Sequence, residues 1–216
     1  MKTDGDNRDY WLAIDKEQIN ALPPVDFDEK VYIIDALSQV NVAVAYLRKC
    51  PVVGFDTETR PSFHRGEHHK VSLLQLSSGT DTFLFRLNKL GLPKQLQDYL
   101  EDETCLKVGL SIHDDFNVMR RLCEFTPRGF VELQEMAAHY CIADLSLQKI
   151  YAIVFGQKIS KSQRLTNWEA PELTLAQQRY AAIDAWACVH IYNQLNDGLF
   201  VPEQSPYKKY PEDGEV

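Results

Sequence analysis

Short apolar runs alternate along the chain with stretches in which apolar residues recur every three or four positions. Runs of about four to eight residues between turn-forming residues are typical of strands, and the three-to-four spacing is typical of amphipathic helices. The apolar runs predict strands at residues 31–34, 52–58, 71–76, 82–85 and 106–112. The helical spacing predicts helices at residues 40–47 and 95–100, and helical patterns dominate residues 114–195, ending in a long helical segment at 175–195.

The order of these elements predicts the class of fold. Residues 77–81, with the sequence Ser-Ser-Gly-Thr-Asp, are a turn signal between two predicted strands, so the sheet is expected to open with antiparallel pairing. The later alternation of strand and helix favours helices packed against a sheet that also contains parallel strands. The sequence therefore predicts an α/β fold with a mixed sheet.

Two terminal segments differ from this central pattern. Residues 1–28 are polar and are interrupted by Pro23 and Pro24, whereas residues 201–216 are rich in proline, tyrosine and charge. We expect an N-terminal arm and a C-terminal tail over these ranges, flanking one domain at residues 29–200. A chain of 216 residues with 44% hydrophobic content can bury one good-sized core, which agrees with a single domain.

The first pair of acidic residues follows an apolar run. Asp56 and Glu58 lie two positions apart in the run Val52–Thr59, and a strand directs residues i and i+2 to the same face. The two carboxylates therefore share one side of the predicted sheet. Taken alone, the pair fits a solvated edge strand equally well, but acids that end a strand with a buried start are typical of the functional edge of a sheet.

Two further elements carry acids. Asp114 and Asp115 follow an apolar run, and their alternative role is to cap a helix, since carboxylates are favourable at a helix N-terminus. Tyr180 and Asp184 lie four positions apart in a predicted helix and therefore share one helix face. The alternative for this pair is a core tyrosine beside a solvent-facing acid. Small residues that would let this helix approach the sheet closely are Ala181, Ala182 and Ala185.

The three acid-bearing elements follow one another in the order D-T-E, I-H-D-D and Y-A-A-I-D. This ordered set resembles the DEDD, or DnaQ-like, exonuclease superfamily in its tyrosine-containing branch, which includes RNase D-like and Werner-type exonuclease domains. The resemblance runs from about Val31 to Leu195 and includes the segments Lys161-Ser162, Asn167-Trp168-Glu169 and Leu173-Thr174. It implies an RNase H-like fold with a mixed five- to six-stranded sheet flanked by helices. It also implies a 3′-5′ exonuclease that hydrolyses phosphodiester bonds at nucleic-acid 3′ ends.

The resemblance also assigns the site residues. The matching catalytic positions are Asp56, Glu58, Asp115, Tyr180 and Asp184. Asp115 is preferred to Asp114 because the family's aspartate stands six residues after the glycine that matches Gly109. Two motif neighbours, Thr57 and His113, are expected to contact the substrate.

Each catalytic position carries an expected role by the same resemblance. Asp56 bridges two metal ions, while Glu58 and Asp184 bind the ion that activates water. Asp115 binds the second ion, through a water molecule. Tyr180 is expected to orient the attacking water, because a phenol with a pKa near 10 is a poor base at neutral pH.

The acids by themselves indicate divalent metal ions. Four carboxylates in one low-dielectric cleft repel one another, so they need cations or raised pKa values to be tolerated. All four are hard oxygen ligands without a paired histidine or cysteine, which favours Mg²⁺ or Mn²⁺ over zinc. Two such ions about 4 Å apart activate water and neutralise the leaving 3′ oxygen in phosphodiester hydrolysis. Two Mg²⁺ or Mn²⁺ ions are therefore the expected cofactors.

Candidate substrate contacts lie outside the acidic motifs. Lys161, Arg164 and Trp168 combine two cations with an aromatic ring, as single-strand binders do, although a lysine and a tryptophan near a helix junction are equally typical of structural residues. A basic stretch after the first motif, expected to be a solvated loop near the substrate backbone rather than a zinc site, comprises His64, Arg65, His68, His69 and Lys70. The expected partner is a nucleic acid, bound at a single-stranded or frayed 3′ end of DNA or RNA.

Composition limits the other functions. A net charge of −8 argues against a broad phosphate-binding surface, but not against an enzyme that grips a strand end through metal ions. Five scattered cysteines without a CxxC pair predict neither a disulfide framework nor a structural zinc site.

The apolar runs also bear on location. They fall short of the roughly 18 residues of a membrane span, and the polar start differs from a signal peptide, so a cytoplasmic protein without a membrane partner is expected. The alternatives left open are a catalytically inactive nucleic-acid-binding protein of the same fold and an RNase H-like endonuclease.

Overall fold

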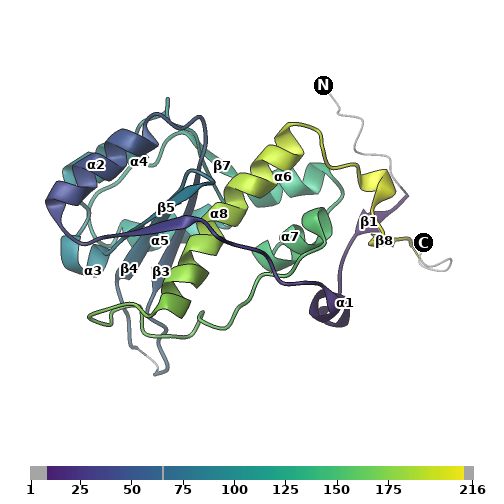
Figure 1. Ribbon diagram of the computed structural model, residues 1–216, viewed down its shortest axis with the longest axis horizontal. Coiled ribbons are helices and arrows are strands. Elements are labelled where there is room, and N and C mark those ends of the chain that lie inside the picture. The colour runs from purple at the N-terminus through teal and green to yellow at the C-terminus, as the bar shows by residue number, and fades with distance from the viewer. Residues whose placement is uncertain (1–8, 65, 212–216) are drawn as a thin grey trace.

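The computed structural model describes residues 9–64 and 66–211, which form a central sheet with helices on both faces (Figure 1). The six strands of the sheet lie in the order β2-β5-β4-β3-β6-β7. They are β2 (Lys30–Ile34), β3 (Val53–Thr59), β4 (Val71–Ser77), β5 (Asp81–Phe85), β6 (Lys107–Gly109) and β7 (Phe130–Glu132). Strand β4 pairs antiparallel with β3 and with β5, and the remaining pairs are parallel. The expected mixed α/β sheet is confirmed.

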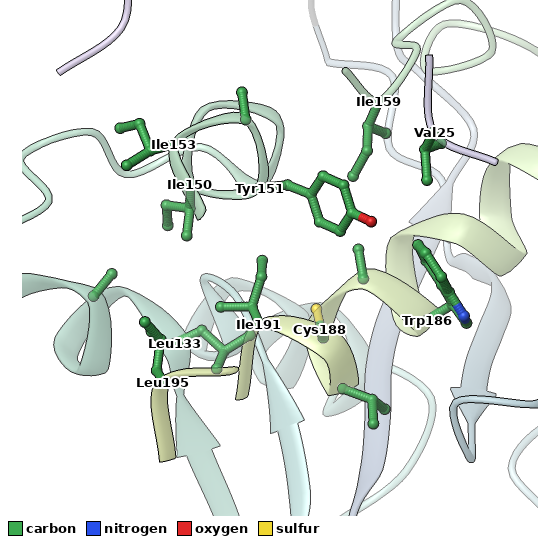
Figure 2. Close-up of a cluster of buried hydrophobic side chains, with 14 of the residues drawn as sticks. Val25, Leu133, Ile150, Tyr151, Ile153, Ile159, Trp186, Cys188, Ile191 and Leu195 are labelled. Atoms are coloured by element: carbon green, nitrogen blue, oxygen red, sulfur yellow. The ribbon is translucent and has the colours of Figure 1, made fainter. Parts of the chain in front are cut away.

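Helices cover the two faces of this sheet and enclose separate cores. One face carries α2 (Leu37–Leu47), α3 (Leu87–Leu90), α4 (Lys94–Leu100) and α5 (Ile112–Met119). The other carries α6 (Leu133–His139), α7 (Leu147–Phe155) and the long helix α8 (Leu175–Asn196). In the second core the Tyr151 ring of α7 lies against Trp186 of α8, with the ring centroids 5.9 Å apart (Figure 2). Helix α8 runs across its face of the sheet (Figure 1).

The predicted strands are confirmed apart from one boundary and one omission. The strand expected at 106–112 ends at Gly109, because Ser111 takes a left-handed backbone conformation with φ of 59° and helix α5 begins at Ile112. Strand β7 lies inside the region predicted to be dominated by helices. It has only three residues, too few for an alternating pattern to be recognised.

Within the described residues, the terminal segments contain short strands and helices. The N-terminal segment forms β1 (Trp11–Leu12) and α1 (Lys16–Ala21). The C-terminal segment forms a 3₁₀ helix, η1 (Pro202–Gln204), and β8 (Lys208–Lys209). Strands β1 and β8 pair antiparallel, which joins the two ends of the described chain. Apolar residues of the N-terminal segment pack into the core that also contains α8, namely Leu12, Ile14, Ile19, Val25 and Phe27. The first eight and last five residues of the predicted arms lie outside the described residues.

No helix within the described residues is long and apolar enough to cross a membrane.

Candidate active site

Two elements bring three carboxylates together on one face of the sheet. Asp56 and Glu58 lie two positions apart on β3, and Asp184 comes from α8, which packs on that strand. Carboxylate oxygens of these three residues lie within 4.8 Å of one another. Asp184 is 7% exposed, so one member of the cluster is almost fully buried.

Close packing of β3 against α8 makes this meeting possible. A methyl group on Gly54 would lie 1.8 Å from the backbone oxygen of Ala185, which leaves room only for glycine. Gly54 precedes Asp56 by two residues, and Ala185 follows Asp184 directly. The helix therefore rests on the strand backbone beside the carboxylates, in agreement with the close approach expected from the small alanines.

The fourth predicted acid joins the cluster through a neighbouring side chain. The Thr57 hydroxyl donates a short hydrogen bond to Asp115 Oδ1, which ties α5 to β3. Asp115 is partly buried, whereas Asp114 is exposed. The geometry thus favours Asp115 over Asp114 and gives Thr57 an intramolecular partner, so that a contact of Thr57 with substrate stays a prediction.

Sequence reasoning missed the residue that fixes the start of α5. Glu132, at the end of β7, accepts hydrogen bonds from the backbone N–H groups of Ser111 and Ile112, with N···O distances of 3.0 and 2.9 Å. A carboxylate at this position satisfies helix N–H groups and complements the helix dipole. Only recognition of β7 as a strand parallel to β6 would have placed Glu132 beside Ser111.

A cleft of about 560 Å³ opens beside the cluster. Its acidic side includes Asp56, Asp114, Asp115 and Asp184, with Tyr180 and Cys188 nearby on α8. Lys161 and Arg164 are both exposed and line the same cleft. Apolar residues complete its wall: Leu110, Leu145, Leu147 and Ile159. Carboxylates, cations and an apolar surface therefore face one space, the combination that a metal-bound phosphodiester with an attached base requires.

The carboxylates perturb one another strongly. Burial, followed by the charge of Asp184, raises the pKa of Asp56 well above its ordinary value. Burial and the neighbouring acids raise the pKa of Glu58 to about 10, although Arg164 acts in the opposite direction. Burial and Asp56 raise the pKa of Asp115 to about 8, against the hydrogen bond from Thr57. Without cations, the cluster thus holds protons that isolated carboxylates lose.

The α8 pair, Tyr180 and Asp184, behaves similarly. Burial raises the pKa of Asp184 to about 7, while its hydrogen bond with Tyr180 and the nearby charge of Lys161 lower it. Burial and the Asp184 charge raise the pKa of the Tyr180 phenol, so this hydroxyl stays protonated at neutral pH. Tyr180 is therefore available as a hydrogen-bond donor beside the cluster and is unsuited to act as a base.

These residues fit divalent metal ions. The grouped donors are carboxylate oxygens, which are the ligands that Mg²⁺ and Mn²⁺ prefer. A cation among them would offset both the mutual repulsion and the burial that raise the pKa values of these acids.

Two residues that were predicted to contact the substrate, Trp168 and His113, contact aromatic or apolar side chains in the structure. Trp168 is 0% exposed and packs in a cluster with Leu73, Leu84, Leu173 and Ala181, which supports the structural alternative for this tryptophan over stacking on a base. Its ring lies 6.0 Å from the Tyr180 ring, which it supports from within the core. His113 is exposed and meets the Phe116 ring edge-on, at a centroid distance of 6.1 Å. Its contact with substrate stays a prediction.

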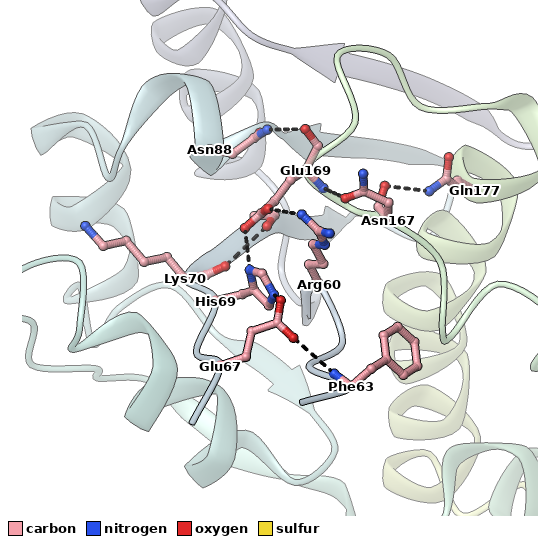
Figure 3. Close-up of polar contacts among 10 residues, drawn as sticks. Arg60, Phe63, Glu67, His69, Lys70, Asn88, Asn167, Glu169 and Gln177 are labelled. Carbon is pink, nitrogen blue, oxygen red and sulfur yellow. Dashed lines mark hydrogen bonds and ion pairs between the residues drawn. The ribbon is translucent and has the colours of Figure 1, made fainter. Parts of the chain in front are cut away.

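The loop after β3 is bound to the segment that carries the cations (Figure 3). Glu169 pairs with Arg60 at 3.2 Å and with His69 at 3.3 Å, and the other ring nitrogen of His69 lies 2.9 Å from Glu67. His69 thus lies between two carboxylates, those of Glu67 and Glu169. Arg65 of the same basic stretch lies outside the described residues.

The same segment is attached to the beginning of α8. Gln177 forms a capping box with Thr174 and donates hydrogen bonds to Asn167 O at 3.2 Å and to Thr166 Oγ1 at 3.1 Å. The segment with Lys161 and Arg164 is consequently joined both to the loop after β3 and to the helix that carries Asp184.

Comparison with known proteins identifies relatives of this chain. The chain is 33% identical over 152 residues to the mouse bifunctional 3′-5′ exonuclease/ATP-dependent helicase WRN, a match that covers 68% of this chain and 11% of that protein. The chain thus spans a small part of this relative, whose other activity lies outside the comparison.

Solved structures show the same fold. The Nibbler EXO domain of Aedes aegypti superposes with a TM-score of 0.71 at 21% identity, covering 84% of this chain and 96% of that domain. The RNase D of Trypanosoma brucei in complex with RNA U12 superposes with a TM-score of 0.69 at 20% identity, covering 78% of this chain and 63% of that chain. These exonuclease domains have the RNase H-like fold, so the expected fold is confirmed.

The family assignment rests on the extent of the match. A family described as 3′-5′ exonuclease matches residues 31–199, well over half of the chain, and this range contains every strand of the six-stranded sheet apart from the first residue of β2. It also contains the carboxylate cluster, and enzymes of this DnaQ-like class use divalent metal ions. The chain belongs to the 3′-5′ exonuclease family.

Proposed function

We propose that the chain is an active exonuclease that hydrolyses phosphodiester bonds at nucleic-acid 3′ ends with two divalent ions, Mg²⁺ or Mn²⁺. The observation that carries this proposal is the meeting of Asp56, Glu58 and Asp184 within 4.8 Å, with Asp115 attached to the same strand through Thr57. Four acids from three elements at one cleft are expensive to bury without cations, and they supply the oxygen ligands that such ions require.

The acids and Tyr180 are assigned different roles in the reaction. The charge of Asp56 acts on both Glu58 and Asp115, and Asp56 in turn is affected by Asp184, so Asp56 would be the ligand best able to serve both ions. When bound, the ions activate a water molecule and stabilise the charge on the leaving 3′ oxygen. The protonated Tyr180 hydroxyl, beside Asp184, donates a hydrogen bond that orients the attacking water.

The remaining groups of the cleft are suited to hold the strand. Lys161 and Arg164 are exposed cations that contact phosphate groups, and the apolar wall formed by Leu110, Leu145 and Leu147 accommodates the terminal base. The net charge of −8 agrees with recognition confined to a strand end. We infer that the substrate has a single-stranded or frayed 3′ end.

Two alternative functions make different predictions. An inactive nucleic-acid-binding protein of the same fold would not need the complete set of acids, whereas this chain carries all four together with Tyr180. An RNase H-like endonuclease would cut within a strand. The acid set therefore favours catalysis, and the family favours action from the end.

A labelled-oligonucleotide assay tests the proposal. Single-stranded DNA, duplex DNA and RNA, each labelled at the 5′ end, are incubated with Mg²⁺ or Mn²⁺, and a descending ladder is expected for at least one of them. An Asp56→Asn variant purified in the same way controls for contaminating nucleases. A 3′-phosphate block should slow the reaction. Cleavage of a circular single strand would instead support the endonuclease, and intact substrates in every reaction would support the binding protein.

A further inference from the structure

Gln75, in the middle of β4, is a buried polar residue that the proposed reaction does not use. Its side chain is 0% exposed, and neither its amide nitrogen nor its amide oxygen has a hydrogen-bond partner within the described residues. An amide removed from water without a partner costs free energy that an apolar residue at the same place would not cost. A group of this kind in a folded protein needs an explanation, and a functional role is one of the few available.

Its position in the sheet supplies that explanation. In the antiparallel pairing of β3 with β4, Gln75 lies directly opposite Asp56. Directly opposed residues project from the same face of the sheet with their β-carbons about 4.5–5.5 Å apart. Gly54 shares this face and touches α8, so Gln75 lies beneath α8, against the inner side of the carboxylate cluster.

We propose that Gln75 is a positioning residue for the metal-binding carboxylates, with its amide N–H oriented toward Asp56 in the metal-bound protein. The proposal rests on the proposed function. Carboxylates that bind metals commonly receive hydrogen bonds from groups behind them, which fix their orientation. A carboxylate has about four lone-pair sites, so Asp56 can bind cations through some of them and accept a hydrogen bond at another.

A purely structural role for Gln75 has a different partner. The indole N–H of Trp168 is also buried without a hydrogen-bond partner among the described residues. Trp168 belongs to the cluster that contains Leu73 and Leu84. Leu73 lies two residues before Gln75 on β4, and Leu84 lies opposite Gln75 on β5. A bond between the indole and the Gln75 amide would hold the core together without acting on Asp56.

Substitution of the amide by an apolar side chain distinguishes the two roles. Gln75→Met keeps the length of the side chain and removes both polar atoms, and Gln75→Leu is a second variant in case methionine packs poorly. For each, the melting temperature without metal, the Mg²⁺ concentration for half-maximal activity and the Mg²⁺-induced rise in melting temperature are measured. Trp168→Phe is the matched control because it removes the other unpaired donor.

A positioning role predicts stability and function moving in opposite directions. The metal-free melting temperature of Gln75→Met should equal or exceed that of the wild type, since an unpaired amide has been removed. The Mg²⁺ requirement should rise about 10-fold to 100-fold, the usual effect of losing a group that supports a metal ligand. Trp168→Phe should leave the Mg²⁺ requirement unchanged.

Three results would overturn the inference. They are a lower melting temperature with an unaltered Mg²⁺ requirement, the failure of both variants to fold, and wild-type behaviour in both measurements. The Mg²⁺-induced rise in melting temperature does not depend on turnover, so it tests Gln75 even if the wild-type protein degrades none of the substrates. A wild-type protein without that rise would reject the metal-dependent function itself, and Gln75 would lose its role with it.

Discussion

A methyl group on Gly54 would lie 1.8 Å from the backbone oxygen of Ala185, so strand β3 and helix α8 meet backbone against backbone. The contact is adjacent in sequence to two of the clustered acids, Asp56 and Asp184. The distance between these carboxylates is therefore set by packing and not by the side chains alone. A small displacement of α8 would separate the ligands contributed by the sheet from the ligand contributed by the helix.

Gly54→Ala is accordingly predicted to reduce both stability and activity. The nearest obstacle is backbone, which cannot rotate away, so α8 has to shift or β3 has to bend. Overpacking of this kind costs about 1–3 kcal/mol or more. We expect a lower midpoint of urea unfolding and a smaller Mg²⁺-induced rise in melting temperature, because Asp184 moves away from Asp56.

A second glycine provides the control. Gly156, at the end of α7, has φ of 66° and open space around it, so alanine there introduces backbone strain without a collision. Gly156→Ala should cost about 1 kcal/mol and leave the Mg²⁺ response intact. Equal metal responses in the two variants would show that the contact between Gly54 and Ala185 does not set the site.

The site was predictable wherever a local spacing fixes side-chain direction. A spacing of two residues on a strand places Asp56 and Glu58 on one face of the sheet. A spacing of four residues on a helix places Tyr180 and Asp184 on one face of that helix. The meeting of the two pairs is a tertiary contact, which only the family resemblance anticipated. The two alternatives for Trp168 stayed open for the same reason, since the burial of an aromatic ring depends on which elements pack around it.

The parts that sequence reasoning missed are held by long-range contacts. Strand β7 has three residues and no alternating pattern, and it forms because β6 offers a parallel partner. Without β7, Glu132 has no reason to lie at the start of α5, 20 residues earlier in the chain. Within the N-terminal segment Leu12 and Ile14 are buried, because their contacts with the core outweigh the polar composition of the segment.

The ion pair between Arg60 and Glu169 is predicted to matter more for substrate binding than for stability. The side chains are 42% and 31% exposed, and such pairs contribute about 0–1 kcal/mol. A double-mutant cycle with Arg60→Gln and Glu169→Gln should therefore give a coupling free energy of unfolding below about 1 kcal/mol. Since Glu169 also anchors the segment with Lys161 and Arg164, KM for an oligonucleotide should rise while kcat changes little. A fall in kcat with constant KM would argue against this anchoring.

Buried Lys107 predicts a dependence of stability on pH. Burial lowers the pKa of its ammonium group from 10.5 to about 8, although its Nζ donates to Asp102 O at 2.7 Å and Tyr99 O at 3.2 Å. Between pH 8 and 10.5 the unfolded chain holds a proton at Lys107 that the folded chain has lost. Stability therefore rises with pH in this window, by up to about 1.4 kcal/mol per pH unit from this group.

Lys107→Met isolates that contribution from other groups that titrate at alkaline pH. The free energy of unfolding of the wild type, relative to the variant, should stay constant from pH 6 to about 7 and increase from pH 8 to 10. Urea unfolding at each pH measures the difference. A difference that is constant across the whole range would mean that Lys107 keeps its ordinary pKa in the folded protein.

Tyr180 and Asp184, one turn apart on α8, are predicted to fail in different ways when altered. Asp184→Asn removes a charged metal ligand, so both turnover and the Mg²⁺-induced rise in melting temperature should fall. Tyr180→Phe removes only a hydroxyl and keeps the ring that packs on Trp168. Turnover should then fall roughly 10-fold to 1,000-fold, the range associated with a lost catalytic hydrogen bond, with the metal response preserved.

Each substitution also has a result that would contradict its assigned role. Normal turnover in Tyr180→Phe would make this tyrosine a core residue that supports α8 and nothing more. An unaltered Mg²⁺ response in Asp184→Asn would remove Asp184 from the ligands and leave its burial unexplained. Asp114→Asn is the matched control, because Asp114 lines the same cleft but is exposed and stands outside the grouped carboxylates. Near wild-type turnover and metal response are expected for it, since loss of a cleft charge alone does not disturb the ligands.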